Sequence, residues 1–384
     1  MLFANHALGV LVFRANLLID QARLSLSSAD MTEERTRQAL PTGTGIAARL
    51  AINALRRRKL AIAPLLRRAG LSEQDFDDRG RRISAASQAK FLEYAAEATD
   101  DRAFGLHLAE EATPREAGLL FCVASAANNV AEAVALFARY SRIANEAARF
   151  KPIRAPGGIV TEISFIGVPR HSARQVTEFG VALTIKGLRE IAGRNIEPTY
   201  LSFIHPRNSG LREFERFFGC PVEFGASGDQ VAFSNETLAL PLVTEDRHLL
   251  ETLRPICDAA AKERSTAIGS LRAAVENEAQ RLLPHGKAKR HIVAKTLGHS
   301  ERTLTRKLAD EGTTYEQVLD QLRQSLALQY IKEQGVSLSQ IAWLLGYEGS
   351  ASFNHAFRRW MGRSPSIARN ESLATKGGTT LQPL

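Results

Sequence analysis

Residues 292–304 read Ile292-Val-Ala-Lys-Thr-Leu-Gly298-His-Ser300-Glu-Arg-Thr-Leu304, and this stretch decides the fold of the carboxy-terminal part of the chain. A short amphipathic helix ends at Gly298, where a turn between two crossed helices needs a left-handed backbone. Ser300 is well placed to cap the following helix by accepting a backbone amide. The stretch therefore predicts two short helices that cross at the small residue Ala294.

The same pattern returns 48 residues later in Ile341-Ala-Trp-Leu-Leu-Gly346-Tyr-Glu-Gly-Ser-Ala-Ser-Phe353. Its turn is one residue longer before the next apolar anchor, Phe353. A single Ala-x-x-x-Gly match is weak evidence, because helical proteins produce it by chance. Two matches, each followed by a helix with a basic face, predict a pair of helix-turn-helix units.

Residues 315–333 lie between the two units and predict one long helix with Leu319, Leu322, Leu326 and Ile331 as its apolar stripe. Two units on a stiff connecting helix can place their second helices in successive segments of the DNA major groove, about one helical turn apart. The base edges in that groove carry a distinct pattern of donors and acceptors for each base pair. Double-stranded DNA is therefore the expected partner.

At this point the segment from Leu271 to Arg369 resembles the DNA-binding domain of the AraC/XylS family of transcription regulators. The resemblance rests on Gly346-Tyr-Glu-Gly-Ser-Ala-Ser-Phe-Asn-His-Ala-Phe-Arg-Arg-Trp-Met-Gly-Arg-Ser-Pro365 and on Ser300-Glu-Arg-Thr-Leu-Thr-Arg306. It implies that Arg302, Thr305 and Arg306 contact bases from the first unit, and that Ser350, Ala351, Asn354 and His355 do so from the second. Two departures bear on the second unit: His355 stands where an arginine is common, and Ala351 cannot hydrogen-bond a base.

The predicted DNA contacts combine readers of bases with groups that position the protein on the backbone. They are Ser300, Arg302, Thr305, Arg306, Lys307, Ser350, Ser352, Asn354, His355, Arg358 and Arg359. Arginine suits guanine and asparagine suits adenine by bidentate hydrogen bonding. Arg358 and Arg359 lie late in their helix, where we expect them to grip phosphates rather than to interact only with water and the helix dipole.

The upstream part predicts an α+β domain. Helical patterns cover residues 130–147 and 172–191, and β-like runs cover 159–165, 199–204 and 231–233. The stretch Ala117-Gly-Leu-Leu-Phe-Cys-Val-Ala-Ser and the later Ala138-Arg-Tyr-Ser-Arg resemble the arabinose-binding-type amino-terminal domain of some of these regulators. This resemblance implies binding of a small-molecule effector or dimerisation, and it identifies no effector-binding residue.

The expected organisation is an α+β amino-terminal domain followed by an all-α domain with two helix-turn-helix units joined by a long helix. Residues 1–41 are an extension expected to be disordered, and Met31 is an alternative start within it. The α+β effector-binding or dimerisation domain covers 42–240, a helical connection 241–265, the DNA-binding domain 266–370 and a disordered tail 371–384.

The charge of the chain is concentrated where DNA binding is predicted. The whole chain has a formal net charge of +9, and residues 264–369 hold sixteen Lys and Arg against nine Asp and Glu. Neutralisation of phosphates supplies much of the affinity of DNA-binding proteins. No membrane span is expected, since the apolar run 7–19 is too short to cross a bilayer.

Other motifs favour ordinary structural roles. Gly43-Thr-Gly45-Ile-Ala-Ala48 matches a dinucleotide fingerprint but lacks a preceding strand, so no cofactor is expected. His107 and Glu110 have H-x-x-E spacing without an evident third ligand, so no metal is expected either. The three cysteines, Cys122, Cys220 and Cys257, are widely spaced, which favours reduced, buried thiols over a disulfide framework. The run 56–59 and Arg67-Arg68 fit a solvated helix face better than a DNA contact.

The sequence thus predicts a cytoplasmic, sequence-specific transcription regulator that responds to a small molecule, and not an enzyme. The partners expected are double-stranded DNA, an effector, a second copy of the chain and, if the protein is an activator, RNA polymerase. The alternative is an enzyme or metabolite-binding protein with a helical assembly domain. The effector, the operator and the choice between activation and repression are left open.

Overall fold

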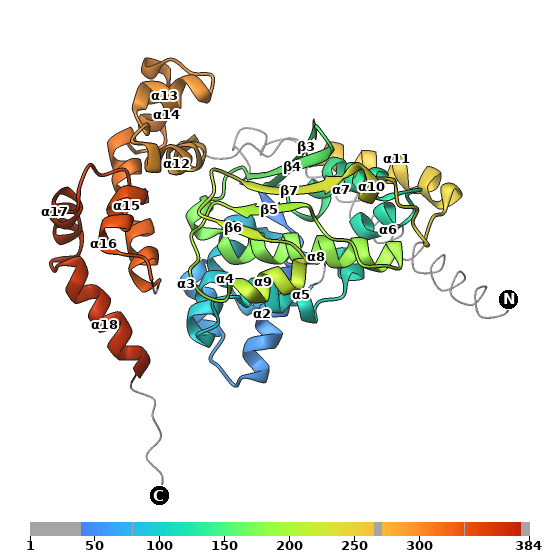
Figure 1. Cartoon of the computed structure of the whole chain (residues 1–384), viewed down its shortest axis with the longest axis horizontal. Coiled ribbons are helices and arrows are strands. Elements are labelled where there is room, and N and C mark those ends of the chain that lie inside the picture. The colour runs from blue at the N-terminus through green and yellow to red at the C-terminus, as the bar shows by residue number, and fades with distance from the viewer. Residues whose placement is uncertain (1–39, 79, 265–270, 334, 378–384) are drawn as a thin grey trace, which may run out of the picture. The chain divides into compact units, whose positions relative to one another are not determined.

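The computed structural model describes residues 40–78, 80–264, 271–333 and 335–377 (Figure 1). An α+β region comes first, and the described residues from Leu271 onward form only helices and turns. The fold class predicted from the sequence is therefore confirmed. The extension predicted at 1–41 lies almost wholly outside the described residues, as do 378–384.

Five strands form the main sheet, in the order β3-β4-β7-β5-β6. The strands are β3 (Ala148–Ala155), β4 (Gly158–Phe165), β5 (Tyr200–Phe203), β6 (Val222–Phe224) and β7 (Asp229–Ser234), and a separate pair is formed by β1 (Thr42–Gly43) and β2 (Ile83–Ser84). Neighbours in the main sheet are antiparallel except β5 and β6, which are parallel. The three predicted strands are confirmed as β4, β5 and β7. The edge strands β3 and β6 escaped prediction because edge strands tolerate charges and proline, as at Lys151 and Pro152.

Alternation along β4 shows why the sheet has one covered face. Thr161 and Ile163 are buried, whereas Ser164 between two inward positions is exposed. Thr161 pairs with Val231 of β7 and Ile163 pairs with Phe150 of β3, so these side chains share the covered face. An antiparallel sheet with one solvated face is expected to alternate in this way.

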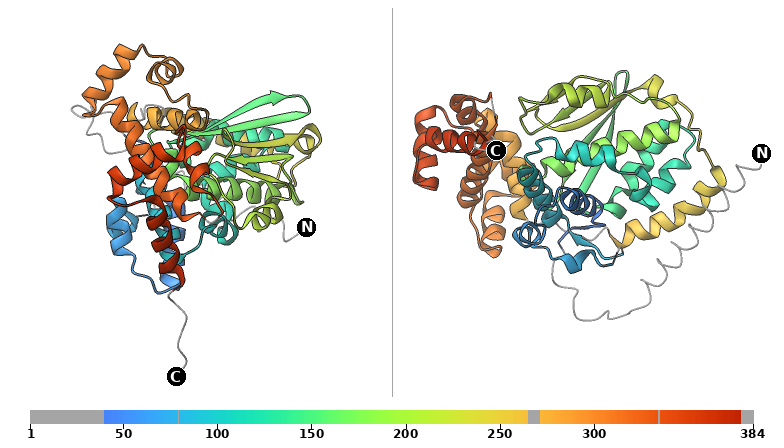
Figure 2. Two further views of the ribbon diagram at one scale, coloured as in Figure 1. Left: turned by 60° about the vertical axis from the view of Figure 1, so that its left-hand side comes forward. Right: turned by 90° about the horizontal axis from the view of Figure 1, so that it is seen from below.

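Helices pack on this covered face and around it (Figures 1 and 2). They are α2 (Ile46–Arg57), α3 (Ala63–Ala69), α4 (Ala85–Thr99), α5 (Phe104–Glu111), α6 (Leu119–Ser125), α7 (Val130–Ala144), α8 (Arg174–Ala192), α9 (Leu211–Phe218), α10 (Asn235–Ala239) and α11 (Arg247–Glu263). The predicted helices at 130–147 and 172–191 correspond to α7 and α8. One continuous hydrophobic cluster joins these helices to the sheet.

The helical region has its own hydrophobic clusters, and no residue of the first region belongs to them. Its helices are α12 (Leu271–Leu282), α13 (Arg290–Thr296), α14 (Glu301–Asp310), α15 (Tyr315–Lys332), α16 (Leu338–Leu344), α17 (Ser350–Met361) and α18 (Pro365–Gly377). The prediction of a disordered tail from residue 371 is wrong for residues 371–377, which belong to helix α18. Pro365 opens this helix and Ala368 packs into a core cluster, which favours continuation of the helix.

Candidate functional site

The first helix-turn-helix unit consists of α13 and α14. Gly298 has a φ of 70° and His299 donates its backbone amide to the carbonyl of Ala294 at 2.8 Å, which closes the turn. The Oγ of Ser300 accepts the amide of Thr303 at 3.1 Å, so the predicted N-cap is confirmed. Val293, Ala294 and Leu304 are fully buried between the helices. The local sequence therefore fixes the angle between α13 and α14.

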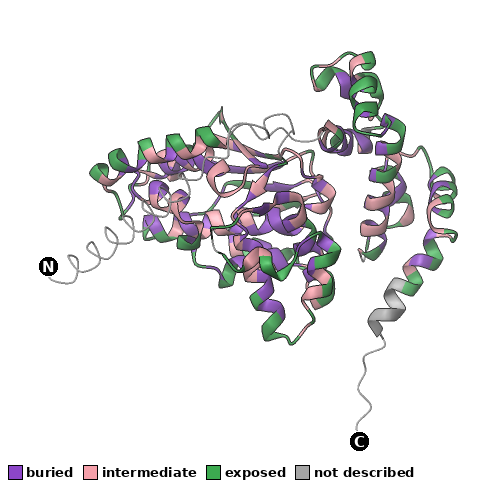
Figure 3. Ribbon diagram, turned by 180° about the vertical axis from the view of Figure 1, so that it is seen from behind, coloured by how far each residue is buried: buried purple, intermediate pink, exposed green. Residues whose placement is uncertain are grey.

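The outer face of α14 is exposed (Figure 3), and it carries three cationic side chains. Arg302, Thr305, Arg306 and Lys307 are all exposed. Thr305 also donates its hydroxyl to the carbonyl of Glu301 at 2.9 Å. Within the described part of the chain, Arg302, Arg306 and Lys307 take part in no ion pair. Their charges are therefore available to a polyanion, as the sequence-based interpretation requires.

The second unit consists of α16 and α17, joined by a tight turn at Gly346. Its φ is 69°, and a Cβ there would lie 2.6 Å from the carbonyl oxygen of Leu283, so only glycine fits. Phe353, the predicted apolar anchor, is fully buried, and so is Phe357, whereas Trp360 is half-buried. The first residue of α17 follows Gly349, and no side chain caps this helix. The second unit thus keeps the helix-turn-helix geometry without the serine cap of the first.

The predicted contacts on α17 differ in accessibility. Ser350, Ser352, His355 and Arg358 are exposed, but Asn354 is half-buried. Arg359 is also exposed, and it forms an ion pair with Asp320 of α15 at 2.5 Å. Arg358 takes part in no ion pair among the described residues. Of the two arginines predicted to grip phosphate, Arg358 is therefore the one whose charge is uncommitted.

Helix α15 connects the two units and contributes to both cores. Tyr315 and Val318 belong to the cluster of the first unit, and Leu322 and Leu326 belong to that of the second. Arg323 in the middle of α15 donates its Nε to the carbonyl of Leu345 at 3.0 Å. A single helix shared by two cores holds the two second helices in a defined spacing, as reading of successive groove segments requires.

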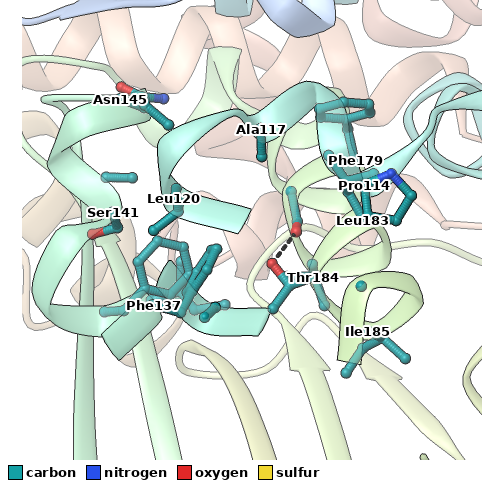
Figure 4. Close-up of a pocket in the computed structure, with 18 of the residues that line it drawn as sticks. Pro114, Ala117, Leu120, Phe137, Ser141, Asn145, Phe179, Leu183, Thr184 and Ile185 are labelled. Atoms are coloured by element: carbon teal, nitrogen blue, oxygen red, sulfur yellow. Dashed lines mark hydrogen bonds between the residues drawn. The ribbon is translucent and has the colours of Figure 1, made fainter. Parts of the chain in front are cut away.

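A second site is a cavity in the α+β region, which the sequence did not reveal. It has a volume of about 200 Å³ and lies between the covered sheet face and helices that include α7 and α8 (Figure 4). Its wall is mostly apolar, with Phe137 from α7 and Phe179 and Leu183 from α8. The signal in the sequence is weak, because the lining comes from segments that meet only in the folded chain.

Contacts join the cavity region to the helical region. Arg174, the first residue of α8, pairs with Glu333 at 3.1 Å, and Arg102 pairs with the same carboxylate at 3.3 Å. The amide of Asn277 in α12 donates to the carbonyl of Phe165 at 2.9 Å, and its oxygen accepts the amide of Arg170 at 2.8 Å. Helix α8 and strand β4 both line the cavity, so two of its lining elements contact the helical region.

His107 and the cysteines that the sequence singled out have structural roles. The protonated ring of His107 donates to two carboxylates, that of Asp101, 2.8 Å from its Nδ1, and that of Glu213, 2.6 Å from its Nε2. These hydrogen bonds raise the pKa of His107 to about 9, against the opposing effect of burial. Cys220 and Cys257 are buried, and burial raises the pKa of both thiols, to about 11 and about 12.

The basic run lies outside any site, whereas the glycine motif contributes Thr44, Ile46 and Ala47 to the wall of the cavity. Arg58 pairs with Asp101 at 3.6 Å, and Arg68 pairs with Glu97 at 3.4 Å and stacks over Tyr94. Gly43 lies in the two-stranded antiparallel sheet, which is not the βαβ unit that a dinucleotide fingerprint needs. Across the described residues, no helix is long and apolar enough to cross a membrane, and no cluster suits a metal ion.

This combination of an α+β domain with an apolar cavity and a helical domain with two exposed recognition helices defines a DNA-binding transcription regulator. Comparisons with known proteins agree. A family model described as the arabinose-binding domain of AraC transcription regulators matches residues 60–242, and a helix-turn-helix family model matches residues 293–371. The chain belongs to the AraC family of transcription regulators.

Several characterised relatives are transcription regulators. The chain is 27% identical to the ornithine utilization regulator of Pseudomonas aeruginosa over 284 residues, which cover 72% of this chain and 82% of the relative. It is 28% identical to the transcriptional regulator VirS of Mycobacterium tuberculosis over 316 residues, which cover 79% and 88%. Among solved structures, the regulator CdpR of Pseudomonas aeruginosa matches 85% of this chain and 98% of its own at 23% identity, with a TM-score of 0.42.

Proposed function

We propose that this regulator binds its operator through α14 and α17 in successive major-groove segments and that a small molecule in the α+β cavity controls this binding. The observation that carries the DNA-binding half is the exposed cationic face of α14. Three cations, Arg302, Arg306 and Lys307, project from a capped helix with no ionic partner in the described part of the chain. Such a face favours DNA, because its side chains can contact base edges and backbone phosphates together.

Helix α8 supports the effector-controlled half. It lines the cavity over most of its length, and its first residue, Arg174, pairs with Glu333 of the helical region. A ligand that shifts α8 changes this contact. Such a ligand biases the helical region only if it binds one conformational state of the protein more tightly than the other. The protein is further proposed to act in the cytoplasm as a homodimer, and an activator would also contact RNA polymerase.

The test is selection of full-length protein on a randomised duplex pool, followed by titration of the selected site against scrambled DNA. We expect one or two motifs spaced by about one helical turn, and specific binding at least about a thousandfold tighter than binding to scrambled DNA. Equal affinity for both DNAs would contradict sequence-specific recognition. Sedimentation of the protein with and without the selected site measures the oligomeric state.

A further inference from the structure

The cavity of the α+β region has a chemically uniform wall. Six phenylalanines contribute to it: Phe121, Phe137, Phe150, Phe165, Phe179 and Phe233. None of the described residues that line it is Asp, Glu, Lys, Arg or His. A charged ligand would lose its hydration here without gaining a counter-charge, which costs far more than apolar contacts return. The wall therefore selects against zwitterionic amino acids and carboxylates.

Most polar side chains in the wall are satisfied within the protein. Thr177 donates its hydroxyl to the carbonyl of Ala173 at 2.6 Å, and Thr184 donates to that of Gly180 at 2.7 Å (Figure 4). The Oδ1 of Asn145 accepts a backbone amide at 2.9 Å. A sugar carries a hydroxyl on nearly every carbon, and most of these hydroxyls would find no hydrogen-bond partner in such a cavity.

Two buried polar atoms in the wall have no hydrogen-bond partner within the described part of the chain. They are the Oε1 of Gln88 and the Oγ1 of Thr161, and both atoms are buried. Gln88 is 5% exposed and Thr161 is 6% exposed. Buried polar atoms are rarely left without a hydrogen bond, so each marks a position where a ligand atom would be stabilised. A hydroxyl suits both positions, because it donates to an amide oxygen and exchanges hydrogen bonds with another hydroxyl.

A glycine keeps the space beside α8 open. Gly180 lies in the middle of this helix, where glycine costs about 1 kcal/mol relative to alanine. Its backbone does not require glycine, because it has no positive φ, and a Cβ there would contact nothing within 4 Å. The effect of glycine at this position is therefore that no side chain fills the cavity beside α8.

We propose that this cavity binds a small, uncharged, largely apolar molecule whose one hydroxyl or similar neutral group hydrogen-bonds with Gln88 and Thr161. Its size is set by the volume of about 200 Å³. An apolar protein cavity of about 150 Å³ binds benzene, so a ligand of roughly ten non-hydrogen atoms fits. Alkylphenols and compact alicyclic alcohols belong to this class. The inference rests on the proposed role of the cavity as the effector site and names the ligand class for it.

The test is calorimetric titration of the full-length protein with a matched probe series. The probes are 4-ethylphenol, ethylbenzene, which lacks the hydroxyl, 4-ethylbenzoate, which carries a charge, and L-arabinose. We expect 4-ethylphenol to bind about fivefold or more tightly than ethylbenzene, since a neutral hydrogen bond contributes about that factor. The benzoate and the sugar should show no binding that 4-ethylphenol displaces. Competitive binding of either one would overturn the proposal.

Four variants locate the binding. Gln88→Leu and Thr161→Val should each reduce the preference for the phenol over ethylbenzene, whereas Ser164→Val, on the exposed face of the same strand as Thr161, should leave it unchanged. Gly180→Leu should fill the cavity and abolish binding of both aromatic probes. Thermal unfolding of each variant reports whether it is folded, and a folded Gly180→Leu protein that still binds 4-ethylphenol refutes the assignment.

Operator selection by the same protein preparations separates this inference from the proposed function. If 4-ethylphenol fails to bind but the protein still selects one DNA motif, the ligand class is wrong and the regulator function stands. If the protein selects no DNA motif, the proposed function fails whether or not the phenol binds.

Discussion

The indole Nε1 of Trp360 donates a hydrogen bond to the Oδ2 of Asp320, 3.0 Å away, and the other oxygen of this carboxylate receives Arg359. One residue of the connecting helix therefore holds two consecutive residues of α17. Because α17 carries the second set of proposed DNA contacts, this carboxylate links the orientation of that set to α15.

Replacement of Asp320 tests this tie. Asp320→Ala should destabilise the helical region by about 1–2 kcal/mol, since it leaves a partly buried indole N–H without its acceptor. Asp320→Asn keeps an acceptor for Trp360 and should cost less than about 1 kcal/mol, because the exposed ion pair contributes little. The chain has two tryptophans, Trp343 and Trp360, and both lie in the helical region, so urea unfolding followed by their fluorescence measures its stability. Equal stability of the two variants would contradict the role of the indole bond.

Arg306 and Arg358 should separate base reading from backbone positioning. Arg306→Ala should cost about 1–3 kcal/mol at the selected site and relax the preference at one base position. Arg358→Ala should weaken cognate and scrambled DNA alike and reduce the salt slope by about one unit. Salt titrations and pool selection with each variant provide the measurement. If Arg306→Ala weakens all sequences equally, the proposed docking of α14 is wrong.

The helical region should act as an independent module. Its hydrophobic clusters include no residue of the α+β region, so a fragment from Ser265 onward is expected to fold and to bind DNA. Its affinity should fall steeply with salt because counterions are released from DNA. Circular dichroism and fluorescence anisotropy at several salt concentrations test this. A folded fragment without salt-dependent binding would contradict the prediction.

The contact of Glu333 with Arg174 and Arg102 should carry part of the effector response. Glu333→Gln removes the charge that both arginines contact, and we expect the ratio of operator affinities with and without a cavity-bound ligand to move severalfold toward one. Glu316→Gln is the matched control, because Glu316 lies near the other end of α15 and pairs with Arg290. Anisotropy titrations of the operator give both ratios. An unchanged ratio for Glu333→Gln would place the coupling elsewhere.

His107 should make the stability of the protein depend on alkaline pH. Hydrogen bonds to Asp101 and Glu213 raise its pKa from 6.5 to about 9, so the protonated ring stabilises the fold below pH 6.5 and this contribution is lost as the pH rises through about 9. His107→Gln should therefore lose less stability than the wild type between these pH values. Urea unfolding followed by circular dichroism measures the difference, with the exposed His291→Gln as control. A parallel decline in the wild type and His107→Gln would exclude the clamp as the cause.

The sequence by itself determined the turns and the helix cap of the helical region. Gly298 and Gly346 take left-handed backbones and Ser300 caps α14, because turn and cap preferences depend on a few neighbouring residues. The apolar spacing of α15 predicted its length for the same reason. The exposed face of α14 also followed from the sequence, since helical periodicity fixes which side chains share a face.

Tertiary structure alone decided the features that join distant segments. Asp320 meets Arg359 across 39 positions, Arg174 meets Glu333 across 159, and no local pattern encodes such pairings. Gln88 and Thr161 lie on a helix and a strand that meet around one cavity, and each taken alone resembles an ordinary polar residue of its element. Long-range packing determines whether a buried polar atom keeps a partner or remains open to a ligand, because it sets both the available space and the neighbouring groups.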